Sequence, residues 1–367
     1  MSKIELVNVK KNYGEVTALD GLTFETKEGE LFCLLGPSGA GKSTTLRIIS
    51  GIDSPDSGDI RIDGQSVVEL MPKERDVALA FESYALYPQF TVEQNLLFPL
   101  EAPARKKELS DEQRKQRVKE VADLLNIGEL LDRFPRELSG GQRQRVGLGR
   151  VLVRKPKIYL LDEPIAHLDA KLRHHMRGEL KKIQSELGIT TIYSTPDQLE
   201  ALSMADTIAL INQGKIEQVG TPDELFDKPE NIFVATFVGD PPMNILDTSI
   251  ENSDVVVDCD VNFQFPMPKD APKSISKYNG KDKLKVGIRP KDIRLVSDKE
   301  KTKHTSGRVF DLDTLGQVTI VSAAIGCLIV KVKVGTEEAP ARDELIHLEL
   351  DLKSLHFFDA ETGQRIK

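Results

Sequence analysis

The chain has 367 residues, a length that favours two domains over one. Its hydrophobic share of 39% excludes a disordered chain, and its formal net charge of −8 lacks the basic footprint of a general nucleic-acid binder, so we expect no nucleic acid among its partners. The three cysteines, Cys33, Cys259 and Cys327, lie far apart without paired spacing. This argues against a disulfide framework or a zinc site and suits a reducing cytoplasm.

The first residues show no apolar signal core, and no run of about 18 apolar residues occurs in the sequence. We therefore expect no membrane-spanning segment, so a role in transport requires docking onto other chains that span the membrane. Residues 1–27 are predicted to form short strands with a turn at Asn12–Gly14. The apolar run Leu31–Leu35 predicts a buried parallel strand, and Thr44–Ser50 predicts a helix.

Between that strand and that helix lies a glycine-rich segment that fits the pattern G-x-x-x-x-G-K-[ST]. Its glycines let backbone N–H groups turn inward around phosphate oxygens, the lysine reaches the β- and γ-phosphates, and the serine after it binds Mg²⁺. A chance glycine-rich turn is the alternative, which the flanking strand and helix disfavour. We expect the phosphates of ATP to be bound by Gly36, Pro37, Ser38, Gly39, Ala40, Gly41, Lys42, Ser43 and Thr44, with Ser43 also as a Mg²⁺ ligand.

Residues from about 90 to 150 differ in character, because their long polar stretches carry apolar residues at helical spacing. In Glu112–Leu125, for example, the apolar residues fall on one face of a helix: Val118, Val121, Leu124 and Leu125. We interpret this segment as a helical subdomain inserted into an α/β core.

The α/β pattern resumes at Ile158–Leu161, an apolar strand that ends in two carboxylates. We expect Asp162 to hold Mg²⁺ through the water shell of the ion, and Glu163 to polarise the attacking water as the catalytic base. An ordinary helix N-cap is the alternative for Asp162, which its pairing with an upstream phosphate loop disfavours. A helix at Ala170–Leu187 and a strand at Thr190–Ser194 are predicted to follow.

The composition changes after Phe237, where Pro241 and Pro242 mark a linker. Short β-like runs separated by turn signals then predict a small all-β barrel of the OB type. We place the boundary near Gly239, which gives an α/β phosphate-loop domain at 1–238 and an OB-like domain at 239–367. The expected strands of the second domain are Leu284–Ile288, Val309–Leu315, Val318–Ser322, Leu328–Val334 and Leu345–Leu350.

The segment Leu138–Gln142 reads LSGGQ, and the sequence around it, LSGGQRQRVGLGRVLVRKPKIYLLDEP, resembles ABC (ATP-binding cassette) ATPases almost throughout. A glycine-containing turn at a helix start offers a hydroxyl, backbone N–H groups and the helix dipole to a phosphate. A plain helix cap is the alternative. The resemblance implies a head-to-tail dimer in which the ATP of an opposite subunit is bound by Ser139, Gly140, Gly141 and Gln142.

The resemblance extends to other positions. Tyr13 matches the aromatic residue that stacks on adenine, with a core tyrosine as the alternative. Ala166–Asp169 occupies the D-loop, where His167 is expected to contact the opposite subunit. Three segments near the C-terminus look like the regulatory (TOBE) domain of importer ATPases of the maltose and glycerol-phosphate uptake class. They are Gly239–Asn244, Val286–Ile293 and Leu355–Asp359.

This class implies the setting of the protein. We expect a peripheral location on the cytoplasmic face of the cell membrane, with integral-membrane permease subunits as direct partners. An extracytoplasmic solute-binding protein would act indirectly by delivering the solute. The C-terminal domain points to a carbohydrate or polyol, by resemblance alone.

Two positions depart from the family. Glu82 replaces the Q-loop glutamine, which gives an oxygen to Mg²⁺ and senses the membrane subunits; a carboxylate still supplies an oxygen but adds negative charge beside the γ-phosphate. Pro196 replaces the switch histidine that donates to the γ-phosphate, and proline lacks both that side chain and a backbone N–H. The helix itself is expected to survive, with Thr195 as N-cap, Pro196 as its first residue and Gln198 completing a capping box.

We therefore expect the ATP site on this chain's own phosphate loop to be weakened. The intact LSGGQ can still complete a site on a different ATPase subunit, which favours a heterodimer; a slow homodimer is the alternative. A non-transport ABC ATPase, as in DNA repair or translation, usually fuses two cassettes or carries long coiled-coil inserts, and neither is seen in this sequence. A regulatory module that senses a metabolite or protein is the third hypothesis, which Glu82 and Pro196 keep open.

Overall fold

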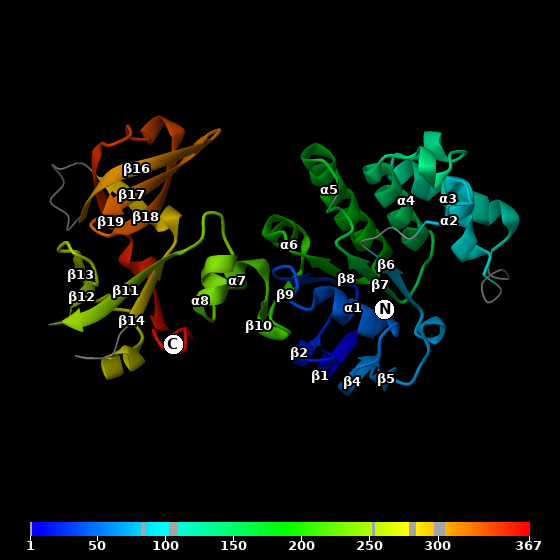
Figure 1. Ribbon diagram of the computed structural model, residues 1–367, viewed down its shortest axis with the longest axis horizontal. Coiled ribbons are helices and arrows are strands. Elements are labelled where there is room, and N and C mark those ends of the chain that lie inside the picture. Colours follow the sequence, from blue (N-terminus) through cyan, green and yellow to red (C-terminus); the bar gives the residue numbers. More distant parts are fainter. Residues whose placement is uncertain are drawn as a thin grey trace. The chain divides into compact units, whose positions relative to one another are not determined.

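The computed structural model describes residues 2–81, 86–102, 109–166, 168–251, 254–278, 284–296 and 305–367. The chain forms two compact units, residues 1–222 and residues 223–367 (Figure 1). The first unit combines helices with a mostly parallel sheet, and the second is rich in antiparallel strands. An α/β domain followed by a strand-rich domain was the fold expected from the sequence, and it is confirmed.

The units divide after Pro222, earlier than the boundary expected near Gly239. The reason is that helix α8 (Ile232–Phe237) packs within the second unit, where its residue Ala235 forms a buried apolar cluster with Met243 and Phe358. Helix α7 (Pro222–Asp227) precedes it. The two prolines read as a linker therefore lie inside the second unit.

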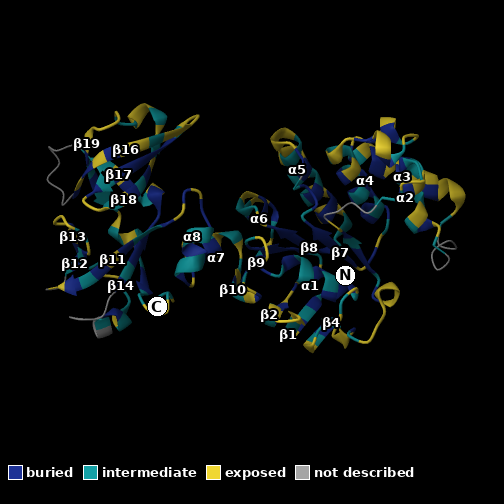
Figure 2. Ribbon diagram, in the orientation of Figure 1, coloured by how far each residue is buried: buried dark blue, intermediate teal, exposed yellow. Residues whose placement is uncertain are grey.

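The first unit is built around a six-stranded sheet with the order β10-β9-β3-β8-β7-β6. All neighbouring strands are parallel except β10 and β9. Every residue of β3, β7 and β8 is buried (Figure 2). The apolar runs of β3 and β7 predict this for strands inside a parallel sheet, whereas β8 is buried despite its threonines and serine. The strands are β3 (Leu31–Leu35), β6 (Val77–Ala80), β7 (Ile158–Asp162), β8 (Thr190–Thr195), β9 (Thr207–Asn212) and β10 (Lys215–Gly220).

This strand order positions the functional residues. Because β8 lies between β3 and β7 and all three are parallel, their carboxyl ends meet at one edge of the sheet, where α/β proteins bind ligands. Helix α1 (Lys42–Ser50) starts at that edge and packs against β6, β7 and β8. Helix α6 (Gln198–Met204) follows β8 and packs against α5 (Ala170–Leu187).

A separate antiparallel sheet, β2-β1-β4-β5, completes the core of the first unit. Ile4 and Leu6 of β1 pair with Ile62 and Ile60 of β4, and all four side chains are buried. Strands β1 and β2 form a hairpin whose tip begins at Tyr13. The strands are β1 (Ile4–Tyr13), β2 (Val16–Glu25), β4 (Ser57–Ile62) and β5 (Gln65–Ser66).

The helical subdomain predicted at about 90–150 contains α2 (Val92–Leu97), α3 (Asp111–Leu124) and α4 (Gly140–Leu152), which lie together at one side of the sheet (Figure 1). Each helix begins with a capping box, in which the N-cap side chain and a glutamine three residues later satisfy backbone N–H groups reciprocally. The buried face of α3 includes Val118 and Val121, as its spacing predicted.

The second unit contains two five-stranded sheets, with the orders β13-β12-β11-β14-β20 and β15-β19-β16-β17-β18. Their neighbouring strands are antiparallel, and all five strands expected from the sequence fall within observed ones. The bounds are β11 (Asn244–Glu251), β12 (Asp254–Val257), β13 (Gln264–Pro266), β14 (Leu284–Ile288), β15 (Ile293–Val296), β16 (Thr305–Leu315), β17 (Val318–Ile325), β18 (Leu328–Gly335), β19 (Leu345–Leu350) and β20 (His356–Asp359).

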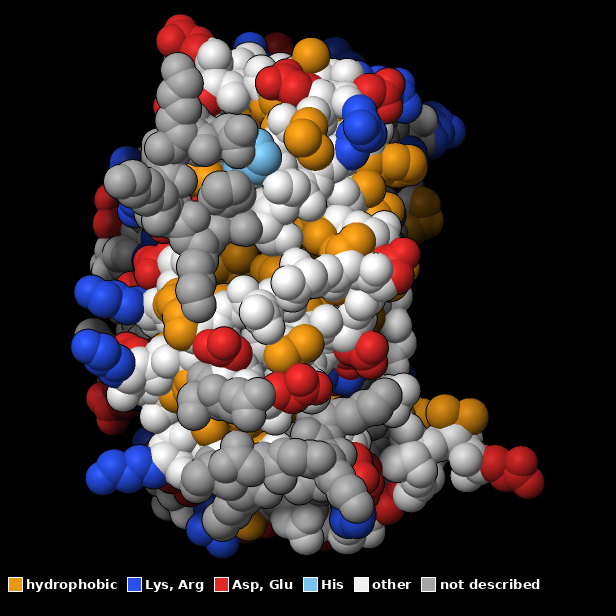
Figure 3. Space-filling view, turned by 90° about the vertical axis from the view of Figure 1, so that its left-hand side faces the viewer, with side chains coloured by type: hydrophobic (Ala, Val, Ile, Leu, Met, Phe, Trp, Pro, Cys, Tyr) orange, Lys and Arg blue, Asp and Glu red, His pale blue; other side chains and the backbone are white. Residues whose placement is uncertain are grey.

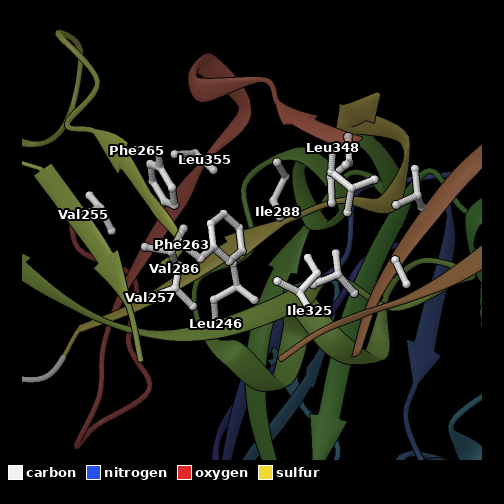
Figure 4. Close-up of a cluster of buried hydrophobic side chains, with 14 of the residues drawn as sticks. Leu246, Val255, Val257, Phe263, Phe265, Val286, Ile288, Ile325, Leu348 and Leu355 are labelled. Carbon is white, nitrogen blue, oxygen red and sulfur yellow. The ribbon is translucent and has the colours of Figure 1, made fainter. Parts of the chain in front are cut away.

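One apolar cluster joins the two sheets of the second unit. Val257, Phe265 and Val286 from one sheet belong to the same buried cluster as Ile325 and Leu348 from the other (Figure 4). Outside this core, the face seen in Figure 3 carries acidic and basic side chains with apolar ones between them.

Candidate functional site

The phosphate loop runs from the end of β3 to the first residue of α1. Two of its glycines are required by the close approach of neighbouring backbone. A Cβ atom at Gly36 would overlap the carbonyl oxygen of Ile211, and one at Gly41 would lie 2.7 Å from that of Ala18. Gly41 also has φ 107°, in the left-handed region, where it caps α1. The curve of the loop is thus set by packing against β9 and β2.

Lys42 places its ammonium group inside this curve. The side chain is only 4% exposed, and Nζ donates to the carbonyl oxygens of Gly36 and Pro37 at 3.0 Å each. Nζ also lies 3.6 Å from a carboxylate oxygen of Glu163. A buried cation next to the amino end of α1 makes the loop electropositive, as phosphate binding requires.

The predicted Mg²⁺ ligands Ser43 and Asp162 meet across the edge of the sheet. Ser43 Oγ donates to Asp162 Oδ1 at 3.0 Å, and the carboxylate is 7% exposed. A hydroxyl and a carboxylate are the oxygen ligands that Mg²⁺ prefers, so the residues fit this ion. No cluster of three or more His, Cys, Asp or Glu within the described ranges could hold a metal alone, so Mg²⁺ at this position needs phosphate and water ligands as well.

Ser194 is a third member of this group, and sequence reasoning missed it. Its hydroxyl, fully buried on β8, donates to Asp162 Oδ1 at 2.6 Å. The hydrogen bond exists because β7 pairs with β8 so that Asp162 lies opposite Ser194. Ser194 is one of four serine and threonine residues among the six of β8, so its identity gave no signal, and only the strand order shows what it contacts.

Glu163 follows β7 with a backbone φ of 45°, a conformation that costs a non-glycine residue about 1–2 kcal/mol. Its N–H donates to the carbonyl oxygen of Ser194 at 3.1 Å, which holds this turn in place. The turn brings the Glu163 carboxylate beside Lys42, on the same side as Ser43 and Asp162. The structure therefore brings together the phosphate loop and both predicted acidic residues.

Tyr13 lies at the surface, with 46% of its area exposed, so it is not a core tyrosine. Its hydroxyl donates to Asp53 at 2.5 Å, and Arg47 of α1 donates to both oxygens of the same carboxylate at 2.8 and 3.0 Å. The Arg47 guanidinium is the largest cause that lowers the pKa of Asp53 to about 2. This chain of contacts fixes the Tyr13 ring relative to the helix that begins in the phosphate loop. Stacking on adenine remains a prediction.

The LSGGQ segment forms the start of α4. Ser139 is the N-cap and accepts from the Gln142 N–H at 3.3 Å, while the Gln142 side chain accepts from the Ser139 N–H at 2.8 Å. Ser139 and Gly140 are exposed. Within the described ranges no hydrogen bond or ion pair joins Ser139 or Gln142 to the phosphate loop.

The switch position, Pro196, lies exposed between β8 and α6. The expected cap is wrong: Asp197, not Thr195, is the N-cap, and α6 begins at Gln198. Thr195 is instead the last residue of β8. Its hydroxyl accepts from the Asp197 N–H at 3.0 Å and donates to the buried carboxylate of Glu200 at 2.7 Å, so it holds the turn before α6. Burial raises the pKa of Glu200 above its usual value. The result is a turn that offers no histidine-like donor at residue 196.

A second contact that sequence reasoning missed joins this turn to the D-loop. Arg173 of α5 donates to the carbonyl oxygens of Ala166 and Leu168 at 3.2 and 3.1 Å, and lies 3.7 Å from the carboxylate of Asp197. Helix α5 is rich in lysine and arginine, so no sequence pattern distinguished Arg173 from a solvated basic residue.

Two residues named for this site, Glu82 and His167, lie outside the described residues.

A glycine-rich loop between a buried parallel strand and a helix, with a lysine inside it and an aspartate at the adjacent strand end, defines a P-loop nucleoside triphosphatase. Sequence comparison narrows the class. Residues 19–166 match the ABC transporter family. The chain belongs to the ABC transporter family, as an ATPase subunit.

Similar proteins span the whole chain. The trehalose/maltose import ATP-binding protein MalK of Thermococcus litoralis is 44% identical and aligns over 100% of both chains. The sn-glycerol-3-phosphate import ATP-binding protein UgpC 2 of Rhizobium johnstonii is 39% identical over 100% of this chain and 99% of its own. Among solved structures, the dimeric cassette MJ0796 bound to ADP and Pi is 32% identical, with a TM-score of 0.56 over 60% of this chain and 98% of its own.

Within the described ranges, no helix is both long enough and apolar enough to cross a membrane.

Proposed function

We propose that this chain powers the uptake of a carbohydrate or polyol-type solute, as the ATPase subunit of a binding-protein-dependent importer. The observation that carries the proposal is the convergence of Lys42, Ser43, Asp162 and Glu163 in a chain that aligns end to end with sugar and glycerol-phosphate import ATP-binding proteins. The subunit would bind peripherally to integral-membrane permeases at the cytoplasmic face. An extracytoplasmic binding protein would supply the solute.

The geometry supports a separate role in hydrolysis for each of these residues. Backbone N–H groups of the phosphate loop and the ammonium of Lys42 would bind the β- and γ-phosphates. Mg²⁺ at Ser43 and Asp162 would neutralise charge on the transferred phosphoryl group. Glu163 would orient the attacking water, from a position that its backbone hydrogen bond to Ser194 maintains.

We also propose that this chain's own site is weak, and that a second, different ATPase subunit completes the working pair. Pro196 offers no donor to a γ-phosphate, and loss of one such donor costs on the order of 10²–10³ in rate. The exposed Ser139 and Gly140 remain available to the site of a partner. A slow homodimer is the competing arrangement, which the dimeric MJ0796 cassette keeps open for this chain.

The test has two parts. The first is the composition of the membrane complex purified through a tag on this chain: permeases with two ATPase types support the heterodimer, and permeases with this ATPase alone support the slow homodimer. Co-purification without permeases would contradict the importer function and favour a regulatory or non-transport role. Uptake assays in the same cells, with labelled sugars and glycerol phosphate, then assign the solute.

The second part measures ATP hydrolysis by the purified chain and by Pro196→His, alone and combined with Glu82→Gln. Because residue 196 is exposed in a turn, we expect the substitution to leave the fold intact and to raise the rate about tenfold or more. Turnover in the unaltered chain that already equals that of an intact importer ATPase would contradict the weak-site proposal.

A further inference from the structure

The second unit contains a cavity of about 170 Å³ that the ATPase function does not use. It lies beside β20, the final residues of the chain and the proline-rich loop before residue 273. Four ionisable side chains line it, and three of them are basic or imidazole groups: Asp270, Lys353, His356 and Arg365. Buried apolar residues such as Phe357 and Ile366 form the remainder of the wall.

The fold brings His356 and Arg365 together through a hairpin at the end of β20. Asp359 Oδ1 accepts from the N–H groups of Glu361 and Thr362 at 3.0 and 2.7 Å, which closes the turn. The chain then runs back antiparallel to β20, with Phe358 opposite Arg365. Since side chains two residues apart on a strand share a face, His356 becomes a diagonal neighbour of Arg365.

These side chains have no hydrogen-bond or ion-pair partner in the part of the chain that the structure describes, and the acidic group that acts on Arg365 beyond ion-pair distance is the carboxylate of Glu230. The Arg365 guanidinium, which is half-buried, makes no hydrogen bond or ion pair there, and neither does the Lys353 ammonium. Nδ1 of His356 is buried without a hydrogen-bond partner. Burial, followed by the positive charge of Arg365, lowers the pKa of His356 to about 4. Polar groups withdrawn from water without partners are costly, and their presence calls for a ligand.

We propose that this cavity binds a small phosphate-bearing anion. Arg365 presents a planar fork that matches phosphate oxygens, and the exposed Lys353 adds a second positive charge. The imidazole of His356 is neutral, and its unpartnered Nδ1 can donate a hydrogen bond as the N–H tautomer. At about 30 Å³ per water, the cavity has room for roughly five or six water-sized groups, enough for one phosphate group of five heavy atoms. The phosphate belongs either to inorganic phosphate or to a small organic phosphate.

Calorimetry on the full chain tests the proposal. The protein is saturated with ADP, because its phosphate loop binds phosphate groups too, and is titrated separately with inorganic phosphate, glucose 6-phosphate and glucose. We expect heat from one or both phosphates and none from glucose. Binding of glucose 6-phosphate alone identifies an organic phosphate as the ligand, whereas binding of both identifies the phosphate group itself as sufficient.

Variants then locate the binding. Arg365→Gln is expected to weaken it about 10- to 100-fold, as loss of a charge-assisted pair does, and Arg365→Lys to recover part of that loss. Arg342→Gln removes an exposed arginine of the same unit outside the cavity and is expected to change nothing. A thermal melt of each variant confirms that it folds.

Three results would overturn the proposal: no binding of either phosphate to the ADP-saturated chain, equal binding by Arg365→Gln and the unaltered protein, or binding abolished by Lys42→Ala while Arg365→Gln retains it. The last result would assign the heat to the phosphate loop. Proton NMR gives a matching test. The proposal predicts that phosphate shifts the His356 proton resonances in the unaltered protein and in Arg342→Gln, but not in Arg365→Gln.

Discussion

Two positions at the end of β8 determine much of the chemistry of individual residues in this protein. Ser194 adds a hydroxyl to the carboxylate of Asp162, which already accepts from Ser43. Two residues later, Pro196 removes the donor that a histidine would give. In the mechanism that we propose, the site therefore has an additional contact on the metal side and lacks one on the γ-phosphate side.

The Ser194 contact leads to the first prediction. Ser194→Ala removes the hydrogen bond that orients Asp162, and loss of a group that orients a metal ligand typically costs 10- to 100-fold in metal affinity. We expect the Mg²⁺ concentration for half-maximal binding of a fluorescent ATP analogue to rise by about that factor. Ser194→Thr should restore much of it. Ser203→Ala, at an exposed position of α6, is the control, and an unchanged Mg²⁺ requirement in Ser194→Ala would rule out the role.

The phosphate loop could be read from the sequence because all its functional residues lie within nine positions, so spacing alone specifies the chemistry. Other contacts could not be read from the sequence, because each depends on which strands and helices become neighbours. They are the contacts of Ser194 and Arg173 and the cap at Asp197. The expected Thr195 cap failed for the same reason. Pairing of Thr195 with Leu35 extends β8 by one residue and turns the threonine hydroxyl to Glu200.

At the scale of the elements, the packing of α4 depends on a glycine. A Cβ atom at Gly149 would lie 2.8 Å from Leu96 of α2 and 3.1 Å from Leu125, at the end of α3. Sequence periodicity predicted these helices and the buried face of α3, but it did not predict how closely they approach. The LSGGQ turn begins the same helix, so the position of α4 also sets where Ser139 is presented.

We therefore predict opposite effects of two glycine-to-alanine substitutions. Gly149→Ala should lower the free energy of unfolding by about 1–3 kcal/mol, because the overpacking outweighs the gain in helix propensity. Gly178→Ala, in α5, meets nothing within 4 Å and should raise the free energy by about 0.5–1 kcal/mol. Urea unfolding measures both. Equal effects of the two variants would show that the close approach at Gly149 does not constrain the packing.

In the whole molecule, different features hold each of the two units together. The first is organised by the sheet that carries the nucleotide site, and the second by an apolar cluster shared between two sheets. Arg289 ties α7 and α8 into the second unit, with its buried guanidinium donating to the carbonyl oxygens of Phe226 and Ala235 at 2.7 and 3.0 Å. The prolines at 241 and 242 suggested a later boundary, because turn-forming residues in a sequence do not reveal which unit α8 packs against.

The stability of the second unit should depend on pH through His356. Its pKa is about 4 in the folded state and 6.5 in the unfolded chain, so only the unfolded state gains this proton between those values. The stabilisation is complete above pH 6.5 and is lost as the pH falls to 4. Cations at Arg365, Arg289 and Lys291 oppose its protonation, and Asp227 favours it.

His356→Asn should remove this component. We expect the free energy of unfolding to fall by about 2 kcal/mol more in the unaltered protein than in the variant between pH 6.5 and 4, a value discounted for the partial exposure of the ring. Comparing the two proteins cancels the carboxylates that titrate in the same range. Parallel pH profiles would show that His356 is not the group responsible.

The most direct test of the ATPase assignment is calorimetric titration of the purified chain with ATP and Mg²⁺, beside Lys42→Ala. The buried ammonium at the phosphate loop predicts measurable affinity in the unaltered chain and a loss of about tenfold or more in the variant. Equal affinity in the two proteins would contradict the account of this loop. Absence of any adenine-nucleotide affinity, with Mg²⁺ present and the partner subunits assembled, would contradict the function as a whole.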